Sequence, residues 1–511
     1  MFEQVRQGRG VRGAGLWSTL AFLALGCSAA PAEDAKERSS TGLEARNEFE
    51  KIAAPQRPAV KSRLIAKFKD SLRMRAEPDG GFRSAATATD PSMASELEPL
   101  AQQYGLHFSQ HIQLPEASLQ DLESEAAQSS GRAQPDLAGV LAVDVPEENA
   151  EETAEALQAS PLTEYVYFEE VDPPPPQQAC SDLSPETPNF TSQQTYHGAA
   201  GLNLTAAMAL APSRGAGVWF ADCEYSYNRN HEDLCGIIPG LPPTSYDDDF
   251  AHHGTAALGE LVSSNNTYGC TGISPEAAAY FFSEQNGRRV TAITQAISAM
   301  RPGDVVLLEM QTSGSKTEVR YGPAELELAV WDAVKVGTDK GVIVVAAAGN
   351  GFKNGSGPGE NLDSANYAEY RARGDSGAII VGAGASNARH DKLSYSTFGS
   401  RVNVQGWGEH IVSTGYGDLA RVGGDVNQAY TNTFGGTSGA SAMVAGAVVW
   451  LQGVANIYLH RRLKPLEMRK LLTSTGTPQG AGEPIGPMPN LEAAVKAIMN
   501  GDPCGDGTCA P

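Results

Sequence analysis

The sequence has little positive charge. Its 511 residues hold 38 Lys and Arg against 60 Asp and Glu, a formal net charge of −22 at pH 7. Binding to nucleic acid or to an anionic membrane surface requires a basic face that neutralises phosphate. The composition therefore argues against nucleic acid and anionic membranes as partners. The sequence also shows no solenoid-like repeat and no phosphate-binding glycine loop.

The apolar run near the N-terminus is too short to anchor the chain by itself. It covers residues 16–25 and follows three arginines. A stable membrane-spanning helix needs about 20 apolar residues. Arginines, a short apolar core and then small residues are typical of an export signal, which we place at residues 1–30.

The end of this signal offers two processing routes. Residues 24–27 resemble a bacterial lipoprotein box, and processing there would leave Cys27 lipidated as a membrane tether. Ordinary cleavage after Ala30 is the alternative, although Pro31 follows directly. Either route predicts an exported protein, secreted or held in a bacterial cell envelope.

Cysteine is scarce, with seven residues in the whole chain. An exported protein can oxidise its cysteines, and Cys504 and Cys509 are close enough in sequence to close a small loop. The sequence leaves the other pairings open, including a free Cys223. The scattered spacing does not favour a metal cluster.

A serine stands at the predicted start of a tightly packed helix. Residues 435–441 are rich in Gly, Ser and Ala and lead into the small-residue run 442–450. The hydroxyl of Ser438 would face unpaired N–H groups and the positive end of the helix dipole, both of which favour negative charge. This is where a serine nucleophile and its oxyanion would sit, although plain packing also explains such a helix start.

Three other polar residues stand at the edges of predicted elements. Residues 217–222 are an apolar strand that ends in Asp222, and residues 341–350 are a second one that ends in Asn350. His253 lies between them in the chain, directly before a glycine. A serine nucleophile needs a base and an orienting acceptor. The chain order Asp, His, Ser is one of the known solutions to that geometry and differs from the α/β-hydrolase and chymotrypsin orders.

Together these motifs resemble those of the subtilisin-like serine peptidases, the subtilases, over residues 195–500. The matching segments are the strand ending at Asp222 with residues 231–234 after it, residues 253–255, 347–350, 394–399 and 436–441. The resemblance implies an α/β fold, a mainly parallel central sheet flanked by helices. It also implies that the chemistry requires no cofactor.

The resemblance assigns four roles. Ser438 would be the nucleophile, and His253 the general base and later the acid. Asp222 would fix the imidazole tautomer, and the Asn350 side chain would donate to the oxyanion beside the backbone N–H of Ser438.

Two departures from the family pattern stand near these residues. The family usually has Ser or Thr and then Gly after the aspartate, whereas this chain has Cys223 and Glu224. Glu224 either raises the basicity of the histidine or points away from it. Glu309 and Gln311 stand where subtilases commonly show Ser-Leu-Gly, which affects the expected substrate preference more than the chemistry.

The region before the catalytic segment divides into further units. The run 159–166 closely resembles the end of the inhibitory subtilase propeptide, which implies a folding chaperone and temporary inhibitor; an ordinary N-terminal domain that stays attached is the alternative. The predicted units are a flexible polar segment at residues 31–57, a small α+β propeptide domain at 58–172, a linker and maturation region at 173–194, the catalytic domain at 195–500 and a short Cys-containing tail at 501–511.

The acidic stretch 246–249 has two interpretations. Its oxygen ligands suit a structural calcium ion, but a solvated acidic loop explains it as well. Of the histidines outside the proposed site, His252 is interpreted as a neighbour of the base and His231 as structural.

The sequence therefore predicts an exported serine endopeptidase, made as a zymogen. Its partners would be protein or peptide substrates and its own propeptide, acting as an intramolecular inhibitor. The alternatives are a catalytically inactive subtilase-fold binding protein and a serine esterase.

Overall fold

The computed structural model describes most of the chain after its N-terminal region. The described residues are 42–46, 49, 62–77, 80–86, 97–112, 114–146, 149–170, 182–244, 248–313, 320–352 and 357–505. The predicted export signal at residues 1–30, with Cys27, and the first part of the predicted linker at 173–194 lie outside them.

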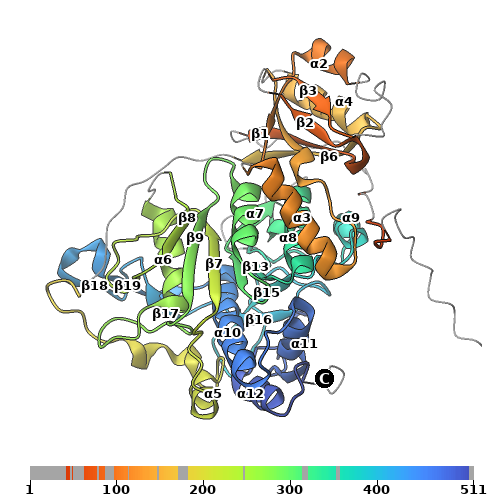
Figure 1. Ribbon diagram of the computed structural model, residues 1–511. Coiled ribbons are helices and arrows are strands. Elements are labelled where there is room, and N and C mark those ends of the chain that lie inside the picture. The colour runs from red at the N-terminus through yellow and green to blue at the C-terminus, as the bar shows by residue number, and fades with distance from the viewer. Residues whose placement is uncertain are drawn as a thin grey trace, which may run out of the picture.

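A seven-stranded sheet lies at the centre of the larger lobe, and every pair of neighbouring strands in it is parallel (Figure 1). The strand order is β16-β15-β13-β10-β7-β9-β8. The strands are β7 Trp219–Glu224, β8 Ile238–Leu241, β9 Ala278–Ser283, β10 Val305–Leu308, β13 Ile343–Ala347, β15 Ile379–Gly384 and β16 Val404–Trp407. The central strands β10 and β13 are buried apolar runs, as expected when helices cover both faces of a parallel sheet.

Helices cover both faces of this sheet. The face that carries Phe220 and Leu307 packs on α6 and α10, and the face that carries Val306 and Val344 packs on α7 and α8. The helices of this lobe are α5 Leu204–Leu210, α6 Asp248–Val262, α7 Arg289–Ala299, α8 Leu328–Lys340, α9 Ala368–Ala372, α10 Gly436–Tyr458, α11 Pro465–Thr475 and α12 Leu491–Met499. The prediction of an α/β fold with a parallel sheet between helices is confirmed.

Helix α10 is long and apolar enough to cross a membrane by length and composition, alone among the described helices, but most of it is buried inside the fold. Its small residues allow the neighbouring elements to approach it closely. At Gly439, for example, an added Cβ would lie 2.5 Å from the side chain of Ile411. We therefore interpret α10 as the core helix of this lobe.

Two small antiparallel sheets border the larger lobe. Their strands are β11 Gln311–Ser313, β12 Arg320–Pro323 and β14 Gly351–Phe352 in one, and β17 Ile411–Thr414, β18 Ala420–Arg421 and β19 Ala429–Phe434 in the other. In the first sheet, β11 follows β10 in the chain and β14 follows β13. In the second sheet, β19 leads into α10. Both sheets therefore lie close to the residues that the sequence assigns to catalysis.

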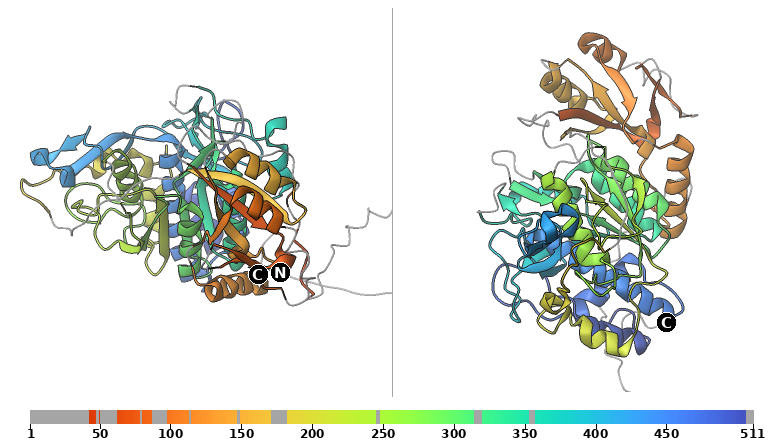
Figure 2. Two further views of the ribbon diagram at one scale, coloured as in Figure 1. Left: turned by 90° about the horizontal axis from the view of Figure 1, so that it is seen from above. Right: turned by 90° about the vertical axis from the view of Figure 1, so that its left-hand side faces the viewer.

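The N-terminal lobe is a separate α+β unit, seen at the top of Figure 1 and of the right-hand view of Figure 2. Its antiparallel sheet has the order β4-β5-β1-β6, and a small hairpin pairs β2 with β3. The elements are β1 Ser62–Phe68, β2 Met74–Ala76, β3 Phe82–Ser84, α2 Glu98–Tyr104, β4 His107–Gln110, α3 Glu116–Ser130, β5 Val140–Asp144, α4 Ala150–Ala159 and β6 Thr163–Glu170.

The sheet of the N-terminal lobe is apolar on both faces. One face packs against α4 in the core of the N-terminal lobe, where Leu64 and Leu157 belong to the same hydrophobic cluster. The other face lies on the larger lobe, where Ile65 and Tyr165 share one hydrophobic core with Trp331 of α8. The two lobes are therefore joined by a continuous apolar core.

Buried charges join the same two lobes. Arg46 donates to both oxygens of Glu164, at 2.8 and 2.7 Å, and lies 3.6 Å from Asp332 of α8. Lys67, fully buried, lies 2.6 Å from Asp70 and 2.5 Å from Glu164. Arg46 belongs to a segment predicted to be flexible, and these contacts show that the prediction does not hold for it.

Candidate active site

The edge of the central sheet between β7 and β10 is a topological switch point. From β7 the chain continues to β8 and β9 on one side, and then crosses to β10, β13, β15 and β16 on the other side. In an open parallel sheet, binding and catalytic groups gather at the carboxyl ends of strands beside such a point. Glu224 ends β7, and Glu309 directly follows β10.

His253 projects toward this edge from α6. The residue after it must be glycine, because a Cβ on Gly254 would lie 2.2 Å from the carbonyl oxygen of Ser226 and 2.7 Å from the side chain of Glu224. The missing side chain lets α6 approach the end of β7 closely. The ring of His253 also packs edge-on against Phe434, which fixes one side of it.

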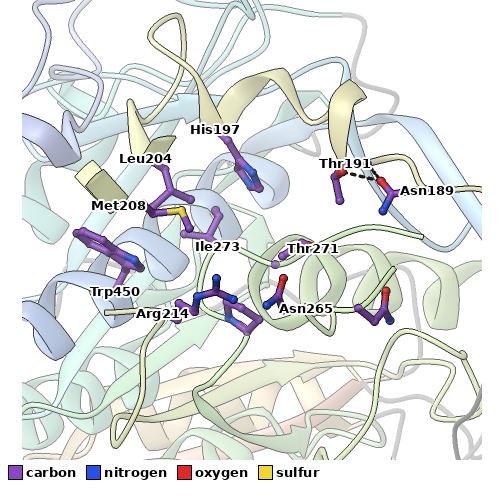
Figure 3. Close-up of a pocket in the computed structure, with 13 residues that line it drawn as sticks. Asn189, Thr191, His197, Leu204, Met208, Arg214, Asn265, Thr271, Ile273 and Trp450 are labelled. Carbon is purple, nitrogen blue, oxygen red and sulfur yellow. Dashed lines mark hydrogen bonds between the residues drawn. The ribbon is translucent and has the colours of Figure 1, made fainter. Parts of the chain in front are cut away.

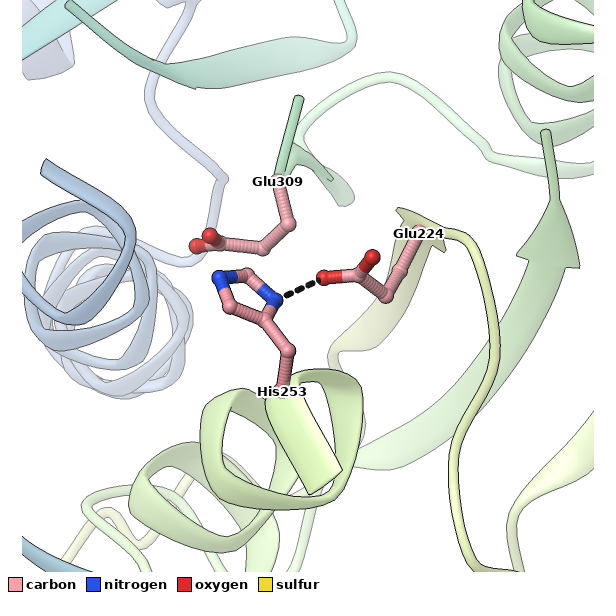
Figure 4. Close-up of side chains that lie close together, drawn as sticks. All are labelled: Glu224, His253 and Glu309. Carbon is pink, nitrogen blue, oxygen red and sulfur yellow. Dashed lines mark hydrogen bonds and ion pairs between the residues drawn. The ribbon is translucent and has the colours of Figure 1, made fainter. Parts of the chain in front are cut away.

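Glu224 is the carboxylate that binds His253. Its Oε2 accepts a hydrogen bond from Nδ1 of the imidazole at 2.5 Å (Figure 4). Its Oε1 accepts from the backbone N–H of Tyr225 at 2.6 Å, and the side chain is buried. A carboxylate held at Nδ1 in this way leaves Nε2 as the basic nitrogen of the ring.

Asp222 does not occupy the position predicted for it. It lies two residues deeper in β7, paired with Leu307 on one side and Phe281 on the other, and is fully buried. Neither of its carboxyl oxygens has a hydrogen-bond partner among the described residues. Burial, and then the charges of Glu224 and Glu309, raise its pKa well above the usual range. The prediction that Asp222 orients the histidine is therefore wrong, and Glu224 takes that place.

The alternation of side chains along β7 explains the error and gives the signal that was missed. Asp222 and Glu224 are two residues apart, so they face the same side of the sheet. The strand was predicted to end at Asp222, but it continues to Glu224. Of two carboxylates on one face, only the last reaches the strand end, where a helix can present a histidine.

Ser438 lies in the first turn of α10. Gly436, two residues before it, has φ +75°, and a Cβ on Gly435 would lie 2.1 Å from the carbonyl oxygen of Gly408. These glycines let the chain turn sharply into the helix. Ser438 is 9% exposed, and no hydrogen bond joins it to His253 among the residues that the structure describes.

Asn350 lies against the same helix start. Its Oδ1 accepts hydrogen bonds from the backbone N–H of Thr437 at 2.7 Å and from the Thr437 hydroxyl at 2.9 Å. Its backbone N–H donates to Gln311 at 3.0 Å. Because the amide oxygen is bound to Thr437, the amide NH₂ is the end of the side chain that can donate to a substrate oxygen.

Glu309 is a site residue that the sequence did not assign to the chemistry. Its Oε1 accepts a hydrogen bond from the hydroxyl of Ser441 at 2.8 Å, and that hydroxyl is also 3.0 Å from the carbonyl of Ser438. Its Oε2 is buried and has no hydrogen-bond partner among the described residues. Figure 4 shows the two carboxylates, Glu224 and Glu309, on opposite sides of the imidazole of His253.

The two carboxylates change the proton affinity of the site. Burial lowers the pKa of His253, but the charge and hydrogen bond of Glu224 and the charge of Glu309 outweigh it and raise the pKa to about 9. Burial raises the pKa of Glu309 to about 8, while the charge of His253 and the hydroxyls of Ser441 and Ser438 act in the opposite direction. The imidazole is therefore a stronger base than an ordinary histidine.

Other predicted residues lie apart from this site. Nδ1 of His252 is 3.2 Å from the backbone nitrogen of Tyr416, which donates to it. His231 is fully buried and bonds the carbonyl of Ala429 at 2.7 Å. Cys223 is a buried free thiol whose pKa is raised well above the usual range by burial and then by Asp222.

Two predictions fall mainly on residues that the structure does not describe. The side chains of the acidic stretch 246–249 lie outside the described residues, so the calcium site stays a prediction. Cys504 is disulfide-bonded, while Cys223, Cys235 and Cys270 are free. The partner of Cys504 therefore lies outside the described residues.

A cavity of about 290 Å³ lies elsewhere in the larger lobe (Figure 3). Trp450 and Met208 line one part of it, and His197 and Arg214 bring polar groups to it. Trp450 is twelve residues beyond Ser438 on α10, a distance of about 18 Å along a helix. This cavity is therefore separate from the site around His253.

Comparison with known proteins shows the family to which this chain belongs. A family model described as the subtilase family matches residues 221–487, a little over half of the chain. Subtilisin DY from Bacillus licheniformis is 27% identical over 289 residues, which cover 55% of this chain and 92% of that protein. Minor extracellular protease Epr from Bacillus subtilis (strain 168) is 29% identical over 48% of this chain and 34% of its own length.

A solved structure matches the fold. Fervidolysin from Fervidobacterium pennivorans, titled a keratinolytic enzyme related to subtilisin, superposes with a TM-score of 0.53 and 14% identity. The match covers 90% of this chain and 65% of that one, so it reaches well beyond residues 221–487. The chain belongs to the subtilase family of serine endopeptidases.

Proposed function

We propose that this protein hydrolyses peptide bonds through an acyl-enzyme on Ser438, with a triad of Glu224, His253 and Ser438. The observation that carries the proposal is the 2.5 Å hydrogen bond from the imidazole of His253 to Glu224. It replaces the triad first predicted from the sequence, in which Asp222 stood in the place of Glu224. The reaction of subtilases requires no cofactor.

The base step follows from the geometry around His253. Ser438 Oγ attacks the scissile carbonyl carbon, and Nε2 of His253 takes its proton. The imidazolium then gives that proton to the leaving amine, and in the second half of the reaction it activates water in the same way. The carboxylate of Glu224 holds the Nδ1 proton throughout and stabilises the imidazolium.

The oxyanion is stabilised at the start of α10. The backbone N–H groups in the first turn of α10 have no partner within the helix and point out of its N-terminus, where the positive end of the helix dipole lies. The backbone N–H of Ser438 and the amide NH₂ of Asn350 donate to the substrate oxygen as it becomes negative. The bonds from Thr437 fix the Asn350 amide in advance, so that little reorganisation is needed during the reaction.

We propose that the N-terminal lobe, within residues 58–172, is an inhibitory propeptide and that the protein is made as a zymogen. Its sheet shares an apolar core with α7 and α8, and the hydroxyl of Tyr165 donates to Asp332 at 3.1 Å. The last strand, β6, ends at Glu170, directly before the predicted maturation region. Cleavage within residues 173–194 would separate the two lobes.

Export completes the proposal. Proteins similar to this chain include a minor extracellular protease, and the N-terminal sequence fits an export signal. Lipidation of Cys27 and secretion of the free protein remain the two routes. The mass of the mature protein and its N-terminal sequence would distinguish them.

The proposed function is tested by labelling with a fluorophosphonate probe. Expressed as the full chain and allowed to mature, the protein should be labelled on Ser438 and should cleave protein substrates. The Ser438→Ala variant should be unlabelled and inactive, and should accumulate with its N-terminal lobe uncut. Labelling of the full chain without cleavage of peptides, but with cleavage of acyl esters, would favour an esterase. No labelling at all would favour a binding protein on a subtilase fold.

A further inference from the structure

The cavity beside α5 has the composition of a small-molecule site. Its volume of about 290 Å³ is close to the lower end of the range of ligand pockets, roughly 300–1,000 Å³. Its lining comes from parts of the chain that are far apart, including α5, the segment 265–275 and α10 (Figure 3). Leu204, Met208 and Ile273 form the apolar wall of the cavity. A concave, mainly apolar surface with a few polar groups suits a partly apolar ligand.

One buried donor at this cavity is unused. The Trp450 side chain is fully buried, and its Nε1–H has no hydrogen-bond partner among the described residues. Figure 3 shows the indole ring beside the space that Met208 and His197 also border. A buried indole N–H usually has an acceptor, because an unpaired donor loses its hydration without return. The indole nitrogen can only donate, so a ligand that satisfies it must bring an acceptor.

A cation lies next to this donor. The hydroxyl of Ser213 donates to the carbonyl of Trp450 at 2.8 Å, which places Arg214, the next residue, beside the tryptophan. Arg214 is the charged residue among those that line the cavity in the described part of the chain. Its contact with Glu276 is long, at 3.8 Å, and the two side chains are 35% and 51% exposed, so this pair binds weakly. The guanidinium can therefore pair with an anion from outside the protein.

The imidazole of His197 adds a neutral polar group. Its Nε2 is buried and has no hydrogen-bond partner among the residues that the structure describes. Burial lowers the pKa of His197 to about 4, so the ring carries no charge at neutral pH. A neutral imidazole can donate or accept. The positive charge at the cavity therefore comes from Arg214.

The lining selects the class of ligand. Water or an inorganic anion could satisfy the donors but would gain nothing from the apolar wall. An organic carboxylate fits both parts, because its charge matches Arg214 and its hydrocarbon matches the apolar wall. Met208 is 41% exposed, so such a ligand would also cover apolar surface that faces water. At about 30 Å³ per water molecule the cavity has room for about ten, which corresponds to a ligand of about ten non-hydrogen atoms.

We propose that this cavity binds a small organic carboxylate with an apolar body. The carboxylate pairs with Arg214 and accepts the indole N–H of Trp450, and the hydrocarbon lies against the apolar wall. Binding requires neither Ser438 nor His253, so a failure here would leave the proposed function intact.

Binding is tested with 3-phenylpropionate, by proton–nitrogen NMR of the uncut Ser438→Ala chain. The indole N–H resonance that Trp450→Phe removes should move downfield and saturate, because the N–H gains an acceptor. The dissociation constant should be no weaker than about 1 mM, as expected for a ligand of this size. A Trp450 resonance that does not move in a large excess of the ligand would show that the cavity holds solvent only, and would overturn the proposal.

Two substitutions test the two parts of the contact. Arg214→Gln should weaken binding by about tenfold or more, whereas Arg389→Gln, which changes a 79% exposed arginine outside the cavity lining, should leave it unchanged. Met208→Glu places a negative charge at an exposed position of the apolar wall and should also weaken binding by about tenfold or more. Melting curves check that each variant is folded. Affinity that neither Arg214→Gln nor Met208→Glu lowers would overturn the proposal.

The uncharged analogue 3-phenylpropanol separates charge from apolar contact. It keeps the hydrocarbon and an acceptor oxygen but cannot form an ion pair with Arg214. The alcohol should therefore bind more weakly than the acid by about tenfold or more. Equal affinity for the alcohol and the acid would overturn the assignment to carboxylates.

Discussion

The two buried charge clusters of this molecule are built in opposite ways. Between the lobes, Arg46 and Lys67 lie against the carboxylates of Asp70, Glu164 and Asp332. At the edge of the central sheet, the buried carboxylates of Asp222, Glu224 and Glu309 have one cationic partner among the described residues, His253. The first cluster is largely balanced in charge and the second is not.

This difference in charge balance gives the two clusters different roles: the balanced cluster stabilises the contact between the lobes, and the unbalanced cluster changes the proton affinity of the site. In a balanced cluster most charges have a partner of opposite sign, and its loss weakens the contact between the lobes. An unbalanced cluster raises the proton affinity of its members, as the pKa of about 9 for His253 illustrates. Strongly shifted pKa values in a cleft are typical of functional sites. Substitutions in the two clusters should therefore change different observables.

The largest effect should come from Glu224→Gln. Glutamine keeps the shape but stabilises the wrong imidazole tautomer, and kcat should fall by about 10⁴-fold, as for the orienting carboxylate of other serine triads. Asp222→Asn is the matched control and should keep activity within about tenfold, because Asp222 makes no hydrogen bond to His253 and burial raises its pKa, which favours the neutral carboxyl. Steady-state kinetics on a peptide substrate measure both. The reverse ranking would restore the triad first predicted from the sequence.

Asn350→Ala should lower kcat by about 10²–10³-fold, the effect of losing one oxyanion donor. KM and thermal stability should change little, because the Asn350 side chain lies at the site rather than in the core. Kinetics and a melting curve check the two parts. An unchanged kcat would show that the amide does not contact the oxyanion.

In the cluster between the lobes, Asp332→Ala should lower stability rather than rate. Removing one partner of a buried ion pair costs about 3–5 kcal/mol, and the lower end of that range is expected here because Arg46 keeps Asp70 and Glu164 as partners. Urea unfolding of the Ser438→Ala chain, which should stay uncut, measures this loss. The control is Asp375→Ala, which removes the partly exposed partner of Arg469 and should cost about 1 kcal/mol or less. Equal losses in the two variants would show that the cluster contributes no special stability.

The pH profile should show the smallest effect. Catalysis needs neutral His253, so kcat/KM should rise with pH through about 9, the raised pKa of this group. Glu309→Gln removes one of the negative charges that raise this pKa, so the rising limb should move to lower pH by about one unit. If the rising limb of the profile stayed at the same pH in Glu309→Gln, the charge of Glu309 would not raise the pKa of His253.

The sequence was sufficient for the fold, and it supplied three of the four residues of the proposed site. Apolar strands with polar residues at their ends predicted the parallel sheet, and the motifs with glycine predicted His253, Ser438 and Asn350 as site residues. These signals are local, because a turn or a helix start needs particular residues at fixed spacing. These features could therefore be predicted from the sequence alone.

Other features depend on contacts that spacing does not encode. The choice between Asp222 and Glu224 depends on where β7 ends, and strand ends are poorly defined by sequence. The direction of the Glu309 side chain depends on its bond to Ser441, 132 residues further on. The burial of Arg46 depends on its pairing with Glu164, 118 residues away.

The hydrogen bond between His253 and Glu224 can be observed directly. Proton NMR of the Ser438→Ala chain should show a low-field resonance from the Nδ1–H of His253. The resonance should persist in Asp222→Asn and disappear in Glu224→Gln. If it disappeared in Asp222→Asn and persisted in Glu224→Gln, Asp222 would be the partner of the histidine and the triad of Glu224, His253 and Ser438 would be wrong.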